Sequence, residues 1–110
     1  MLSIVLGFLV STSIAATPVQ LRASDGSQVY AHGSLSSGSK KGVVLAHMTG
    51  RDARDWNFLS KRLDGVKLST IAIDLRGHGK SAKAGTELTE GDYKSMVHDL
   101  EAGVQWLRKN

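Results

Sequence analysis

Residues 71–81 read IAIDLRGHGKS, and this stretch limits what the rest of the chain can be. A short apolar run with β-branched residues ends in Asp74, which predicts a buried strand. Gly77 and Gly79 follow within five residues and predict a sharp reversal of the chain, because glycine adopts positive φ at little cost. Gly79-Lys80-Ser81 also ends like a phosphate-binding loop. The first question is therefore whether the stretch binds a nucleotide.

The pattern around this triplet argues against a phosphate site. The G-x-x-x-x-G-K-[ST] motif needs a glycine five residues before Gly79, and Asp74 stands there with the wrong charge for phosphate. Residues 82–91 are expected to form a loop, not the helix whose N-terminus would receive the anion. A dinucleotide fingerprint fails too, since Ala82 replaces its third glycine. We expect neither a nucleotide nor any other cofactor.

The residues before this stretch predict a parallel strand-helix-strand unit. Residues 42–47, GVVLAH, form a short apolar run typical of a strand buried on both faces. Trp56, Leu59 and Leu63 then recur at helical spacing, and Asp64-Gly65 ends that helix. Residues 68–75 give the next strand. Two strands joined by a helix are expected to lie parallel.

The two ends of the chain add a hairpin and a second helix. Residues 19–23 and 28–33 flank an Asp-Gly pair, which predicts an antiparallel hairpin followed by a polar loop over residues 34–42. A long helix is expected to begin at Thr89 or Asp92. Its apolar stripe comprises Tyr93, Met96, Val97, Leu100, Val104 and Leu107. The fold class is therefore α/β: an antiparallel hairpin plus parallel strands with covering helices.

Composition narrows the functional classes. The 110 residues carry a net charge of +4 with Lys and Arg spread along the chain, which indicates a solvated basic surface and no nucleic-acid site. There is no cysteine, so disulfides and a thiolate nucleophile are excluded. The four histidines show no paired ligand spacing, and no metal site is expected. Residues 1–16 are uncharged and apolar, which predicts a signal peptide, export to the periplasm or medium, and a domain over residues 17–110.

The order of these motifs resembles one family. An apolar strand ending in His47-Met48-Thr49-Gly50, a helix, and a strand ending in D-x-R-G-x-G-x-S from Asp74 to Ser81 are similar to the N-terminal part of the α/β-hydrolase fold. The resemblance covers residues 28–110. It implies that a backbone amide of Met48 or Thr49 helps to form an oxyanion hole. The family has a glycine where Met48 stands, so both donors remain candidates.

The same resemblance assigns scaffold roles at the rim of an active site. His47 is expected to brace the turn by hydrogen bonding, and Asp74 to accept hydrogen bonds from loop amides. Arg76 is expected to pair with a carboxylate, and Gly77 and Gly79 to turn the chain beyond the sheet. None of these residues is expected to be catalytic.

The sequence contains no G-x-S-x-G nucleophile elbow, so no catalytic residue is assigned. The main hypothesis is a truncated α/β hydrolase whose parent cleaves an ester, thioester or amide bond in a small-molecule substrate, the fragment itself being inactive. A short non-catalytic binding module on the same scaffold is the alternative. A third hypothesis, unrecognised chemistry at Asp74, His78 or Ser81, predicts turnover of activated esters. In the family's strand order the strand over residues 42–47 lies between the fourth strand and a fifth strand that these 110 residues lack. Its edge would therefore be unpaired, which predicts self-association.

Overall fold

A four-stranded mixed sheet lies at the centre of the computed structural model, which describes residues 16–110. The elements in chain order are β1 (Thr17–Arg22), β2 (Gln28–Ser34), β3 (Gly42–Ala46), η1 (Ala53–Trp56), α2 (Asn57–Gly65), β4 (Ser69–Asp74), η2 (Gly79–Ser81) and α3 (Glu90–Lys109). The predicted signal peptide lies outside the described residues except for Ala16, and it stays a prediction. Within residues 16–110, no helix is long and apolar enough to cross a membrane.

The sheet has the order β1-β2-β4-β3. β1 pairs with β2 antiparallel around the Asp25-Gly26 turn, and β2 pairs with β4 antiparallel. β3 and β4 are parallel, with Val44 opposite Ile71, and α2 crosses between them. The predicted hairpin and parallel crossover are therefore confirmed, as is the α/β fold class.

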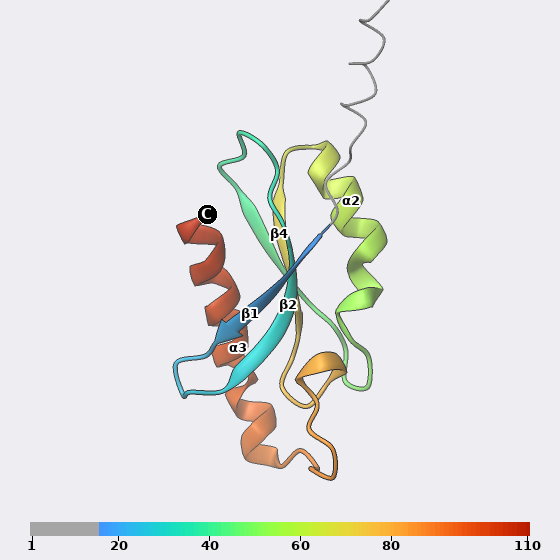
Figure 1. Cartoon of the computed structure of the whole chain (residues 1–110), viewed down its shortest axis with the longest axis vertical. Helices are drawn as coiled ribbons and strands as arrows, with labels where there is room; N and C mark the ends of the chain where they lie inside the picture. The colour runs from blue at the N-terminus through green and yellow to red at the C-terminus, as the bar shows by residue number, and fades with distance from the viewer. Residues whose placement is uncertain (1–15) are drawn as a thin grey trace, which may run out of the picture.

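The two helices cover opposite faces of the sheet, which Figure 1 shows nearly edge-on between α3 and α2. The α3 side holds the larger core, formed by Leu21, Val29, Ala31, Ile71, Ile73 and Leu75. The α2 side holds a smaller one around Leu45, Ala53 and Ala72. This division follows from strand geometry, since alternate side chains of β4 point to opposite faces.

The helix α3 begins as expected but buries a different face. The Thr89 side chain accepts a hydrogen bond from Asp92 N–H, and the Asp92 carboxylate accepts one from Thr89 N–H, which makes a capping box. The predicted apolar stripe is wrong in part, because Tyr93, Val97 and Val104 are exposed. The buried face instead runs through Asp99 and Gly103.

The prediction that residues 42–47 are buried on both faces is also wrong in part. β3 pairs only with β4 among the described residues, so it is an edge strand, and Val43 and Val44 are half-buried. The edge position itself agrees with the expected strand order. The residues just before α2, Ala53–Trp56, form a 3-10 turn. Asp52 stabilises this turn by accepting a hydrogen bond from Arg54 N–H.

Candidate functional site

The parallel strands β3 and β4 end at the same edge of the sheet, and the buried carboxylate of Asp74 organises the loops there. Its Oδ1 accepts a hydrogen bond from Ala53 N–H at 2.7 Å, and its Oδ2 accepts one from Lys80 N–H at 3.0 Å. One side chain thus fixes both the turn before α2 and the turn after β4. The expected role of Asp74, as an acceptor for loop amides, matches this geometry.

His47 links the same two loops from the end of β3. Leu75 N–H donates to His47 Nε2 at 3.1 Å, and His47 Nδ1–H donates to the Met48 carbonyl oxygen at 2.8 Å. Because a carbonyl oxygen only accepts and an amide N–H only donates, these two hydrogen bonds assign the proton to Nδ1 and the acceptor role to Nε2. The ring also packs against His78, with 4.8 Å between the centroids. Both nitrogens of His47 are therefore committed to bracing the turn, and neither is free to act as a base.

The two candidate oxyanion donors follow directly after His47. The Met48 carbonyl accepts a second hydrogen bond from Arg51 N–H at 3.0 Å, so the Met48–Thr49 peptide is held from its oxygen side. The hydrogen bonds of residues 16–110 include none donated by Met48 N–H or Thr49 N–H. Both residues are exposed, Met48 at 78%. Backbone donors that are fixed in place and still unpaired are what an oxyanion hole requires.

The two glycines of the D-x-R-G-x-G-x-S segment are required by the backbone. Gly77 has a φ of +80° and Gly79 a φ of +50°, in the left-handed region that favours glycine. A Cβ on Gly79 would also lie 2.5 Å from the Asp74 carboxyl carbon. The chain can therefore reverse over Asp74 only if this position has no side chain.

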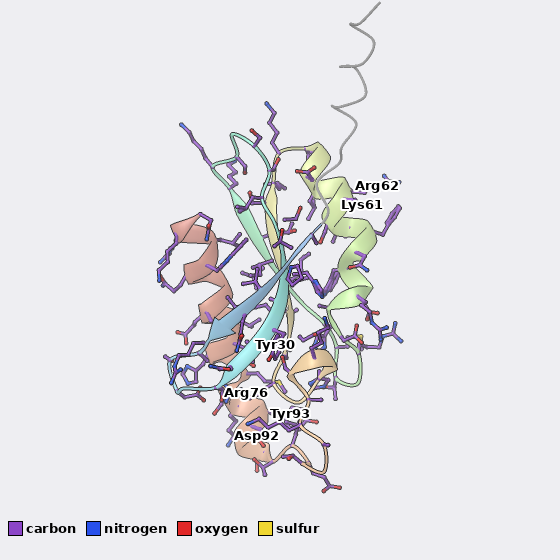
Figure 2. All side chains as sticks on the ribbon, in the orientation of Figure 1. Tyr30, Lys61, Arg62, Arg76, Asp92 and Tyr93 are labelled. Atoms are coloured by element: carbon purple, nitrogen blue, oxygen red, sulfur yellow. The ribbon has the colours of Figure 1, made fainter. Side chains whose placement is uncertain are left out.

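Arg76 lies between two carboxylates from distant parts of the chain. Its guanidinium reaches Asp99 on α3 at 2.7 Å and Asp25 in the β1–β2 turn at 2.7 Å. Its backbone N–H donates to Asp99 Oδ2 at 3.0 Å. Asp99 is fully buried, whereas the Asp25 side chain is 32% exposed. Figure 2 shows Arg76 at the end of the molecule where α3 begins, close to Asp92.

Hydrogen bonds in the ion pairs shift the pKa of Asp25, Arg76 and Asp52. The hydrogen bonds from Arg76 and then from Ser27 N–H lower the pKa of Asp25 to about 2. The pKa of Arg76 is raised, first by its hydrogen bonds to Asp99 and then by those to Asp25. In the turn before α2, hydrogen bonds from Arg54 lower the pKa of Asp52 to about 2. Asp25 and Asp52 are therefore anions at neutral pH.

Ser81 and His78, which the third hypothesis invoked, are both buried and are not paired with each other. Ser81 Oγ donates to the Asp74 carbonyl at 2.6 Å and accepts from Tyr30 N–H at 2.9 Å. His78 Nδ1 donates to the Arg76 carbonyl at 3.1 Å. The serine is thus a strand-joining residue with no imidazole to take its proton. Among residues 16–110 there is also no group of three or more acidic or histidine side chains that could hold a metal.

Sequence reasoning missed two residues of this region. It expected a carboxylate for Arg76 but did not identify Asp25 or Asp99. Asp99 lies on the buried face of α3 among apolar neighbours, and a search for apolar spacing passes over it. Its position three residues after Met96 and four before Gly103 was the available signal, since such residues share one helix face.

No protein-family model matches the chain, but solved structures do. An esterase from Exiguobacterium antarcticum is 26% identical, with a TM-score of 0.62 over 86% of this chain and 32% of its own. An esterase from Pyrococcus furiosus is 25% identical, with a TM-score of 0.61 over 89% of this chain and 36% of its own. An epoxide hydrolase from an endophytic Streptomyces is 24% identical, with a TM-score of 0.66 over 83% of this chain and 26% of its own. At this identity the match shows the fold alone.

The chain thus spans 26–36% of the length of these three structures. Two of the three, the proteins from Exiguobacterium antarcticum and Pyrococcus furiosus, are esterases, and they are 26% and 25% identical to this chain.

Proposed function

Because this chain is the N-terminal portion of an α/β-hydrolase domain, we propose that it supplies the oxyanion-binding side of a hydrolase active site. The proposal rests on one observation above all. The N–H groups of Met48 and Thr49 stand unpaired among residues 16–110, next to a peptide whose oxygen is held by His47 and Arg51. Such donors stabilise the negative charge that develops on a carbonyl oxygen under attack.

The reaction of the parent domain is the serine-type hydrolysis of an ester, thioester or amide bond. The two esterases among the similar structures support this class of substrate. In such a reaction a serine oxygen attacks the carbonyl carbon, a histidine takes the serine proton, and the carbonyl oxygen becomes an oxyanion. Of these groups, the described residues contribute only the backbone amides that would bind the oxyanion.

The 110 residues alone are inactive in this proposal. They contain no G-x-S-x-G elbow, and the buried Ser81 is committed to hydrogen bonds with Asp74 and Tyr30. An unactivated serine is a weak nucleophile. The nucleophile, its acid and its histidine must therefore come from residues outside this sequence.

The coding DNA beyond the Asn110 codon tests this proposal when it is translated in all three frames. The expected result is a short apolar strand followed within a few residues by G-x-S-x-G. An unrelated sequence in every frame would refute it. In a longer protein found this way, Met48→Pro and Thr49→Pro each delete one N–H, and loss of the true donor should lower kcat by about 10²–10³-fold. Circular dichroism of each variant confirms that the fold survives.

A non-catalytic binding module is the second candidate, and the edge of β3 favours it. That edge is unpaired within residues 16–110, and a strand of a partner can add to it.

A further inference from the structure

Basic side chains that are spread along the sequence gather at one end of the fold. This end lies opposite Asp74, where β2 finishes and β3 and β4 begin. The Ser69 N–H donates to the Lys41 carbonyl oxygen at 3.1 Å, which joins the loop before β4 to the loop before β3. The last turn of α3 reaches the same place, since a Cβ on Gly42 would lie 3.0 Å from Leu107 Cδ1. The two loops and the end of α3 therefore form one surface.

Charge is divided unequally between this surface and the rest of the chain. Within residues 16–110 the surface carries seven lysines and arginines and a single acidic residue, Asp64, which is a net side-chain charge of +6. The remainder holds seven basic and nine acidic residues, a net side-chain charge of −2. The seven exposed basic residues, here termed the basic end, are Lys40, Lys41, Lys61, Arg62, Lys67, Arg108 and Lys109. Figure 2 shows two of them, on α2, at the end of the molecule away from Arg76.

We propose that the basic end binds an anionic lipid surface. Each lysine or arginine close to such a surface adds to the attraction, so a cluster of this size binds it well. The proposal does not depend on the hydrolase reaction. It is also independent of the strand that lies beside β3, because strands add to a sheet sideways and the basic end lies at the strand ends. In this orientation the edge that holds Asp74 and the Met48 and Thr49 amides faces the water.

Exposed apolar side chains among the basic ones favour lipid over nucleic acid. Val66, which is 65% exposed, directly precedes Lys67, and Leu35, which is 39% exposed, begins the loop before β3. Ser36 Oγ donates to the Asp64 carbonyl oxygen at 3.2 Å, which holds these two loops side by side. Apolar side chains enter the boundary between headgroups and acyl chains, but they add nothing to a contact with a phosphate backbone.

The apolar N-terminal segment is attached to the fold at the same end. Thr17, the first residue of β1, lies opposite Gly33 near the end of β2. Residues 1–16 carry no charge, and residues 4–10 read IVLGFLV. One apolar anchor combined with a polybasic patch binds a membrane more firmly than either does alone.

The backbone at Lys67 supports a role for its side chain. Lys67 N–H donates to the Asp64 carbonyl oxygen at 3.0 Å and Leu68 N–H to the Leu63 carbonyl oxygen at 2.9 Å, which makes a Schellman motif at the end of α2. Lys67 has a φ of +60°, in the left-handed region where this motif usually has glycine. The backbone alone favours glycine here, and binding of an anion by the side chain explains the lysine.

Vesicle flotation of the 110-residue chain, made by cell-free synthesis, tests the role of charge. The chain should float with vesicles of equal parts phosphatidylglycerol and phosphatidylcholine, and bind more weakly to phosphatidylcholine alone. Lys40→Gln combined with Lys41→Gln should weaken binding to the anionic vesicles by about five-fold per lysine. Lys80→Gln combined with Lys83→Gln, an exposed pair at the other end of the fold, is the matched control and should bind like the parent chain.

Two single substitutions separate binding from folding and lipid from nucleic acid. Lys67→Gly should raise the midpoint of urea unfolding, because it relieves the positive φ, and still weaken vesicle binding several-fold. A variant that is more stable and binds less does not lose binding through unfolding. Val66→Ser should weaken vesicle binding without a change of charge, while Val97→Ser, which is 51% exposed on α3 before substitution, should not.

Several results would overturn the proposal. They are a chain that stays at the bottom of the gradient with anionic vesicles, equal binding to charged and uncharged vesicles, equal losses in the two lysine pairs, or parent-like binding by Lys67→Gly or Val66→Ser. Tighter binding to duplex DNA than to anionic vesicles at equal phosphate concentration, lost in the Lys40 and Lys41 variant, would instead identify a nucleic-acid surface.

Discussion

Asp99→Asn is the substitution that most directly measures how the candidate site is held together. The buried carboxylate accepts from the Arg76 N–H and from its guanidinium. Asparagine has nearly the same shape, but its amide nitrogen cannot accept, so at least one buried donor of Arg76 loses its partner. An unpaired buried donor costs about 1–3 kcal/mol, and breaking one side of a buried ion pair costs about 3–5 kcal/mol.

We therefore expect a loss of ~3 kcal/mol, because Arg76 keeps its second carboxylate at Asp25. For a domain of this size that lowers Tm by roughly 12–24 °C. The assay is urea unfolding followed by circular dichroism, with Asp25→Asn as the matched control on the more exposed side of the same guanidinium. The control should lose clearly less stability. Equal losses in the two variants, or a loss in Asp99→Asn too small to resolve, would show that the buried Asp99–Arg76 pair does not hold this region together.

Three further predictions concern acid stability and backbone geometry. The pKa of Asp25 in the folded chain is lowered from 3.8 to about 2, so its contribution to the free energy of unfolding is present above pH 3.8 and lost as the pH falls through about 2. In urea titrations the stability difference between the parent chain and Asp25→Asn should therefore shrink over that pH range. Gly79→Ala should destabilise the fold far more than Gly85→Ala. Both glycines have positive φ, so each substitution costs about 1–2 kcal/mol of backbone strain, but only at Gly79 would the added Cβ also clash with Asp74. Thr89→Ala should cost about 1 kcal/mol through loss of the α3 cap, while Thr86→Ala, in the loop before α3, should be neutral in the same unfolding assay.

The elements of the fold could be predicted because each has a strong local signal. The Asp25-Gly26 turn, the β-branched run of β4 and the Thr89 cap lie where the sequence indicates. The roles expected of Asp74 and His47 also match the observed hydrogen bonds, since polar residues at the ends of parallel strands meet at one edge of the sheet.

Features that depend on distant contacts could not be predicted in this way. Val97 and Val104 fit an apolar stripe on α3, yet the helix turns Asp99 and Gly103 toward the sheet. The Asp99 carboxylate pairs with Arg76 beneath the helix, and Gly103 allows α3 to lie close against β4. A Cβ on Gly103 would lie 2.7 Å from Ile73 Cδ1. Neither contact can be predicted from the sequence of α3 alone, because both depend on residues of β4 and the turn after it.

In the function proposed above, this chain carries the oxyanion side of a hydrolase site without its nucleophile. Intact-mass spectrometry of the 110-residue chain after incubation with a fluorophosphonate tests this directly, with an active serine esterase as the positive control. We expect an unchanged mass, because Ser81 is buried and its Oγ is held by Asp74 and Tyr30. An adduct on Ser81, lost in Ser81→Ala, would contradict it.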